Sequence, residues 1–295
     1  IFYTLARVAS LGFALWKARD FVTAGLVELR TALSLCWSNI RVGAKVLLST
    51  TAGTLILGVA RFMVDANWGI AEFGIVSLAV LITTFVMTLA SQVTMVLFPA
   101  LRQAEREEAI SFFVAARDGL STLLPLAYVL YAPLAVLLTW WLPQYEASFR
   151  LFALLMPLCV FDTQMTAVGN TFLWVLRKEG RLLAVNLCTL SISALFAAVG
   201  TFVLHSIPFV FGGAVLAVIV RYIYTERYVS RSFGVDGTLL HLGAIALSAC
   251  FVASAFLLPT WEAWGLITVS CALYVFVNRG LLAKVVRSLK SSRRA

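Results

Sequence analysis

Apolar runs long enough to cross a membrane alternate with short polar connections along most of the chain. Neither Val46 to Ala60 nor Phe73 to Pro99 contains a charged residue. A bilayer core about 30 Å thick is crossed by a helix of about 20 apolar residues, so each run with its flanks predicts one spanning helix. The same pattern predicts nine spans, at residues 1–16, 42–61, 73–98, 119–142, 150–173, 182–204, 207–224, 238–258 and 262–278.

Residues 21–40 differ from these runs because apolar and charged residues are mixed in them. Apolar residues recur at helical spacing from Val22 to Trp37, and Glu28 and Arg30 lie among them. This pattern predicts an amphipathic helix in the membrane interface. The hydrophobic pattern as a whole therefore predicts an all-α polytopic membrane protein with about nine transmembrane helices.

The composition agrees with this fold class and excludes several others. Hydrophobic residues make up 61% of the chain and charged residues 13%, whereas a soluble domain is about half apolar and about a quarter charged. The net charge of +9 comes from basic residues in short connections between apolar runs. Because they form no basic stripe on a polar face, we expect membrane lipids and no nucleic acid as partners.

The positions of lysine and arginine predict how the chain is oriented. The connections after odd-numbered spans, together with the tail, hold 20 of the 23 Lys and Arg residues. The connections after even-numbered spans hold only Arg61 and Arg150, and Arg7 lies within the first span. Since basic loops favour the cytoplasmic side, we expect the C-terminus in the cytoplasm and the start of the chain outside.

One stretch resembles a known family of transporters. It reads ARFMVDANWGIAEFGIVSLA at residues 60–79, followed by QVTMVLFPALRQ at residues 92–103. In the polysaccharide-flippase branch of the multidrug/oligosaccharidyl-lipid/polysaccharide (MOP) superfamily, a helix ending in an Arg-x-x-x-Asp turn with WGI and FG precedes a helix ending in VLFPALR. The chain is similar to that branch in both motifs.

The resemblance implies a MATE/MOP-like architecture of two six-helix lobes joined by an amphipathic connector. Because the chain begins at Ile1 inside an apolar run, we expect it to be the C-terminal two-thirds of a protein of about fourteen helices. The expected parts are the last helix of a truncated N-terminal lobe (residues 1–20), the connector (21–41) and the second six-helix lobe (42–230). Two additional transmembrane helices (238–279) and a basic cytoplasmic tail (280–295) follow.

The resemblance also implies a function. Members of that branch flip a lipid-linked oligosaccharide, a sugar chain on a polyprenyl diphosphate, across the bacterial cytoplasmic (inner) membrane by alternating access. The product feeds polysaccharide biosynthesis of the cell envelope, such as the O-antigen of lipopolysaccharide. The alternatives are a drug/cation antiporter of the same superfamily and a membrane enzyme or polymerase of envelope polysaccharide synthesis. A coupling ion is a further expected partner.

The motifs expected of an enzyme do not occur in the sequence. There is no GxSxG, HExxH, P-loop or glycine-rich nucleotide motif, and the five cysteines have no metal-binding spacing. The predicted external connections, at residues 61–72, 143–149, 205–206 and 259–261, are too short for a catalytic loop. We therefore expect no enzyme activity, no cofactor and no metal site.

Asp162 is the clearest candidate for a functional residue. It lies midway along the predicted span 150–173, with Gln164, Thr166 and Asn170 nearby. An ionisable group within a bilayer is costly and therefore a functional candidate, and Asp162 and Thr166 share a helical face. We interpret this face as the wall of a hydrophilic cavity, where Asp162 binds a cation or pairs with an arginine. The alternative is a hydrogen bond or salt bridge that only holds the helices together.

Three further charged residues are candidates for the substrate cavity. Arg7 lies within the first predicted span, where its guanidinium suits a diphosphate; the alternative is that it reaches back to the interface. Arg61 and Asp65 are four residues apart at the outer end of the second span. They form either a helix-surface salt bridge or contacts with substrate.

Overall fold

The secondary structure agrees with the predicted fold class. A computed structural model of the protein describes residues 2–17, 29–95, 106–235 and 240–281. Within these ranges every regular element is helical, and seven segments are long and apolar enough to cross a membrane. This confirms an all-helical chain of the multi-pass membrane type. The spans predicted at 1–16 and 238–258 coincide with shorter helices, so the number nine stays a prediction.

The chain packs into two units, residues 1–47 and 48–295, which are described separately. The first contains α1 (Phe2–Lys17) and the beginning of α3 (Leu29–Trp68). Four parts of the predictions lie outside the described residues: 18–28 of the predicted first helix and connector, 96–103 at the end of the span predicted at 73–98 and in the second motif, 238–239 at the start of the span predicted at 238–258, and 282–295 of the predicted tail.

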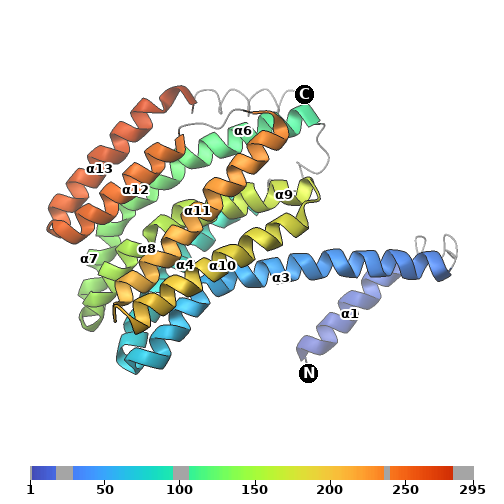
Figure 1. Ribbon diagram of the computed structural model, residues 1–295, viewed down its shortest axis with the longest axis horizontal. Coiled ribbons are helices and arrows are strands. Elements are labelled where there is room, and N and C mark those ends of the chain that lie inside the picture. Colours follow the sequence, from blue (N-terminus) through green and yellow to red (C-terminus); the bar gives the residue numbers. More distant parts are fainter. Residues whose placement is uncertain (1, 18–28, 96–105, 236–239, 282–295) are drawn as a thin grey trace. The chain divides into compact units, whose positions relative to one another are not determined.

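The second unit is a bundle in which consecutive long helices run in opposite directions (Figure 1). Two predicted spans are built from more than one helical segment. The span predicted at 119–142 comprises α6, the 3₁₀ segment η1 and α7, and the span predicted at 150–173 comprises α8, the π-helical segment η3 and α9. The described elements after α3 are α4 (Ile70–Met95), α6 (Arg106–Leu123), η1 (Leu124–Leu130), α7 (Tyr131–Trp141), η2 (Pro143–Tyr145), α8 (Glu146–Gln164), η3 (Met165–Asn170), α9 (Thr171–Val175), α10 (Glu179–Phe202), α11 (Ile207–Phe233), α12 (Leu240–Leu257) and α13 (Thr260–Val277).

The connection between α3 and α4 is much shorter than the loop predicted at residues 61–72. The helix continues through the polar residues to Trp68, and only Gly69 leaves it, with φ of 88°. The Phe73 N–H then donates to the Gly69 carbonyl oxygen at 3.0 Å. Polar residues such as Arg61 and Asp65 end the apolar run, but they do not end the helix. The helix ends at Gly69, whose left-handed backbone conformation is one that glycine adopts readily.

The turns of the second unit gather at its two ends. The α3/α4, α7/α8, α10/α11 and α12/α13 turns lie at one end, and the α9/α10 turn and the C-terminal end of α11 lie at the other (Figure 1). Within the described part of the second unit, the basic α9/α10 turn and the basic end of α11 therefore lie opposite the four less basic turns, which is the separation that the Lys and Arg alternation predicts.

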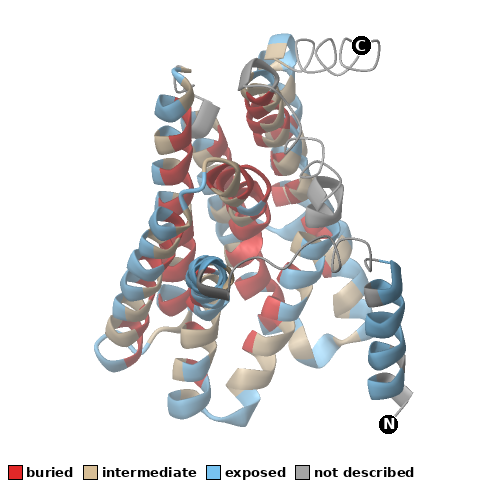
Figure 2. Ribbon diagram, turned by 90° about the vertical axis from the view of Figure 1, so that its right-hand side faces the viewer, coloured by how far each residue is buried: buried red, intermediate tan, exposed pale blue. Residues whose placement is uncertain are grey.

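The core of the second unit is centred on α8, which packs against α4, α6, α11 and α12. Its buried side chains include Phe152, Leu155, Phe161 and the helix-interior Pro157. Figure 2 shows buried residues concentrated on the inner faces of the helices. Lipid is as apolar as these side chains, so close packing rather than a hydrophobic driving force holds such helices together.

Glycines allow α10 and α11 to approach closely. A Cβ added at Gly213 would lie 2.6 Å from Cγ of Phe196, and one at Gly200 would lie 2.7 Å from Cγ2 of Val210. Neither position leaves room for a methyl group. In contrast, a Cβ at the neighbouring Gly212 would meet nothing within 4 Å.

Replacing Gly213 with alanine is expected to lower the thermal unfolding temperature of the detergent-purified protein. Overpacking a close contact costs roughly 1–3 kcal/mol, because Phe196 or the backbone has to move. The matched control is Gly212→Ala, which should unfold at the wild-type temperature. Equal unfolding temperatures for the two variants would show that α10 and α11 do not pack in this way.

Candidate functional site

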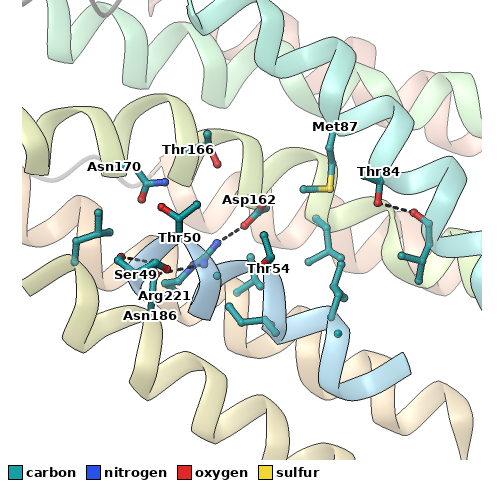
Figure 3. A pocket seen from close by; sticks show the side chains of 18 of the residues that line it. Ser49, Thr50, Thr54, Thr84, Met87, Asp162, Thr166, Asn170, Asn186 and Arg221 are labelled. Atoms are coloured by element: carbon teal, nitrogen blue, oxygen red, sulfur yellow. Dashed lines mark hydrogen bonds and ion pairs between the residues drawn. The ribbon is translucent and has the colours of Figure 1, made fainter. Parts of the chain in front are cut away.

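A cavity of about 450 Å³ lies within the second unit, between α3, α4, α8, η3, α10 and α11 (Figure 3). Part of its wall is apolar, but hydroxyl and amide side chains from several helices also line it. These polar residues are Ser49, Thr50, Thr54, Thr84, Thr166, Asn170 and Asn186.

The charged residues of the cavity wall are Arg61, Asp162 and Arg221. Arg221 of α11 forms an ion pair with Asp162 of α8 through Nη2 and Oδ1 (Figure 3). The side chain of Arg221 is 4% exposed and that of Asp162 is 27% exposed. The guanidinium is thus embedded in the wall, while the carboxylate is partly open to the cavity.

A short chain of hydrogen bonds holds Arg221 in place from its other side. Its Nη1 donates to Oδ1 of Asn186 at 3.4 Å. Asn186 of α10 donates through Nδ2 to both the backbone oxygen and Oγ of Ser49, each at 2.9 Å. An ideal Cβ at Gly53 would lie 3.7 Å from Nη1 of Arg221, so this turn of α3 lies directly beside the guanidinium.

The π-helical segment η3 continues the polar wall beyond Asp162. Thr166 and Asn170 both line the cavity, one and two turns after Asp162. π-helical turns are rare and are often found at functional sites. A Cβ at Gly169 would lie 2.7 Å from Sδ of Met165 and 3.1 Å from Cγ2 of Thr225, so the segment is packed tightly against α11 on its far side.

Three of the six candidate residues from the sequence line this cavity: Arg61, Asp162 and Asn170. The pairing of Asp162 with an arginine was one of the predicted arrangements, and Arg221 is that arginine. Arg61 donates through Nη2 to Oγ of Ser77 at 3.1 Å, and its guanidinium lies 5.6 Å from the centre of the Phe73 ring. Its contacts are therefore with α4. Of the two arrangements predicted for Arg61 and Asp65, the salt bridge does not form among the described residues, and contact with substrate stays a prediction.

The other three candidates are not among the residues that line the cavity. Gln164 is buried, and its Oε1 accepts a hydrogen bond from Oγ of Ser121 at 2.7 Å. It lies two residues after Asp162, and such positions face different sides of a helix. Asp65 is exposed near the end of α3, and Arg7 is exposed on α1 in the first unit.

A second group of buried charges joins α6 to α11. Arg117 bonds through Nε to Oδ1 of Asp118 at 2.8 Å, and through Nη1 to Oε1 of Glu226 at 3.2 Å and Oγ of Ser230 at 3.3 Å. Its guanidinium also lies 5.5 Å from the centre of the Phe113 ring. We call these residues the Arg117 cluster, and they connect helices distant in sequence.

Arg117 and Arg221 are interior residues that the hydrophobic pattern did not identify. Arg117 was placed in a connection, and Arg221, at the end of the span predicted at 207–224, was counted with the connection that follows it, yet their relative exposures are 1% and 5%. Removing these two from the twenty leaves eighteen of 23 Lys and Arg residues in the basic connections, so the alternation survives. The sequence contains one indication that the helix continues past Arg221: no proline or glycine occurs between Arg221 and Gly234. α11 ends at Gly234, where φ is 69°. A helix of that length carries Arg221 well inside the bundle.

Neither a metal site among the described residues nor a similar protein indicates what the cavity binds. Among the described residues, no group of three His, Cys, Asp or Glu side chains is placed to hold a metal ion. No protein-family model matches the chain, and searches of curated proteins and of solved structures identify no similar protein. A functional assignment therefore depends on the cavity itself and on the motifs in the sequence.

Proposed function

We propose that the protein is a polysaccharide flippase of the MOP superfamily that translocates a lipid-linked oligosaccharide across the bacterial cytoplasmic membrane. Its two lobes would alternate between cytoplasmic and outward openings, with the C-terminus in the cytoplasm. The headgroup would enter the polar cavity while the polyprenyl chain stays in the lipid. The observation that carries this proposal is a polar, charged cavity enclosed by helices of membrane-spanning length.

The charges of the cavity favour an anionic headgroup. Of the residues that the structure places in its wall, two are cationic, Arg61 and Arg221, and one is anionic, Asp162. Arginine forks match the oxygens of phosphate groups. The hydroxyl and amide side chains around them offer hydrogen bonds of the kind that sugars require, so the wall contains partners for both parts of the headgroup.

The same charges count against a drug/cation antiporter. Such a transporter needs an acidic cavity, but the carboxylate of Asp162 is already neutralised by Arg221. A membrane polymerase remains the alternative from the enzyme class. It predicts transfer of sugar by the purified protein, a reaction that the flippase proposal excludes.

The proposal is tested with full-length protein reconstituted into liposomes that contain a fluorescent polyprenyl-diphosphate oligosaccharide in both leaflets. A membrane-impermeant sugar oxidant added outside modifies only the outer leaflet. Active protein should raise the modified fraction from the outer-leaflet share to nearly the whole pool, without changing the oligosaccharide length. Modification that stays at the outer-leaflet share would contradict the proposal, and a longer oligosaccharide would indicate a polymerase.

A further inference from the structure

We propose that Arg221 is an exchangeable anion site, in which Asp162 is the internal counter-ion and a diphosphate oxygen of the substrate replaces it. This inference rests on the proposed function and specifies how its headgroup is recognised. It assigns opposite roles to the two members of the ion pair. Arg221 binds the diphosphate, and Asp162 competes with it.

The first step is that Arg221 is fixed while Asp162 is comparatively free. The guanidinium is held through Asn186 to Ser49, and its side chain is 4% exposed. Within the described residues, the Asp162 carboxylate accepts a hydrogen bond from Arg221 alone, and the Asp162 side chain is 27% exposed. A ligand in the cavity therefore meets the carboxylate first and can displace it without disturbing the guanidinium.

The second step is that Asp162 uses only part of the guanidinium edge that faces it. The pair is made through Nη2. The Nε–H on the same edge is buried and has no acceptor within the described parts of the chain. Arginine binds phosphate best through two parallel N–H···O bonds, so a phosphate group can satisfy both donors where Asp162 satisfies one.

The third step concerns the cost of the exchange. An unpaired charge left inside a helix bundle is strongly destabilising. Replacing Asp162 with a phosphate keeps Arg221 compensated throughout, and the displaced carboxylate remains in the polar cavity beside the exposed Thr166 hydroxyl. Return of Asp162 to Arg221 then expels the phosphate. The competition therefore supplies both a binding site and a means of release.

The test measures binding of inorganic pyrophosphate to the purified full-length protein by titration calorimetry. Because Asp162→Asn removes the competitor, it should bind pyrophosphate more tightly than wild type by at least about tenfold. Arg221→Gln should lose binding. Arg221→Lys keeps the charge without the fork and should bind about tenfold more weakly than wild type. The controls Glu262→Gln and Arg150→Gln carry the same charge changes at exposed positions and should bind as wild type does.

Unchanged or weaker binding by Asp162→Asn would overturn the proposal, and so would retained binding by Arg221→Gln or wild-type binding by Arg221→Lys. Absence of pyrophosphate binding in both wild type and Asp162→Asn would overturn it as well. Each variant is first checked for a single symmetric elution peak, and Asp162→Ala replaces Asp162→Asn if the latter aggregates. Tighter binding of farnesyl diphosphate than of pyrophosphate identifies the lipid-linked anion as the ligand, whereas equal affinity identifies the free anion.

The inference and the proposed function can fail separately. If the pyrophosphate-binding results are as expected but the liposome assay detects no translocation, the anion site is supported and the flippase function is contradicted. If translocation is observed but Asp162→Asn does not bind pyrophosphate more tightly than wild type, the flippase function is supported and the proposed exchange is wrong.

Discussion

Substituting glutamine for Arg221 is expected to reduce the rate of lipid-linked oligosaccharide translocation by at least about a hundredfold. The reason is that Arg221 is the buried cation of the cavity wall, held in place by Asn186 and paired with Asp162. Losing an arginine–phosphate interaction of about 3 kcal/mol corresponds to a change of that size. The initial rate in the liposome assay gives the measurement.

The matched control for this prediction is Arg150→Gln, which removes the same charge from an exposed position at the beginning of α8. It should translocate at the wild-type rate. The partly exposed Asp162 carboxylate can be hydrated in Arg221→Gln, so we expect that variant to insert and purify normally. Translocation by Arg221→Gln at the Arg150→Gln rate would remove Arg221 from the mechanism.

Substituting methionine for Arg117 is expected to destabilise the protein by about 3–5 kcal/mol. The side chains of Arg117 and Glu226 are 2% and 0% exposed, so the substitution removes a buried positive charge that compensates Glu226 and Asp118. Methionine keeps the apolar stem of the side chain but lacks the guanidinium, so the substitution removes the charge, its hydrogen bonds and the contact with the Phe113 ring. A denaturant titration in detergent, followed by tryptophan fluorescence, measures the loss.

Arg227→Met is the control, because Arg227 is adjacent to Glu226 on α11 but exposed. Its stability should be close to that of wild type. The double variant Arg117→Met/Glu226→Gln should recover part of the loss, since it also removes the uncompensated carboxylate. A loss in Arg117→Met no larger than in Arg227→Met would show that the Arg117 cluster contributes nothing to stability.

The helical architecture could be predicted because the hydrophobic pattern depends on the bilayer alone. Seven described segments that meet the length and hydropathy of a spanning helix match predicted spans. Helix ends could not be predicted as well, because charged residues end an apolar run without breaking a helix. Arg117 and Arg221 were counted with connections for this reason, and both are inside the bundle.

The cavity could be predicted only in part. Asp162 was identifiable because a carboxylate in the middle of an apolar run is costly. Its partner lies 59 residues away, and no local pattern connects the two. Gln164 was included because it is close in sequence, but helix geometry turns it toward Ser121 and away from the cavity. Which polar residues face each other depends on how helices pack, and periodicity does not specify that.

The proposed function requires that the space around Arg221 and Asp162 is a water-filled substrate cavity rather than a packing defect facing lipid. Its most direct test is the reaction of single cysteines with a charged, membrane-impermeant thiol reagent, since thiolates form and react in water. Thr54 lines the cavity on α3, and Leu195 is an exposed apolar residue of α10 outside the residues that line it. The two variants, Thr54→Cys and Leu195→Cys, are made in full-length protein whose native cysteines are replaced by alanine.

We expect Thr54→Cys to react readily and a polyprenyl-diphosphate oligosaccharide to slow that reaction. Leu195→Cys should stay unreactive in the membrane. If Thr54→Cys reacts no faster than Leu195→Cys, the cavity is not aqueous, and a pathway for a charged headgroup through this part of the protein is contradicted.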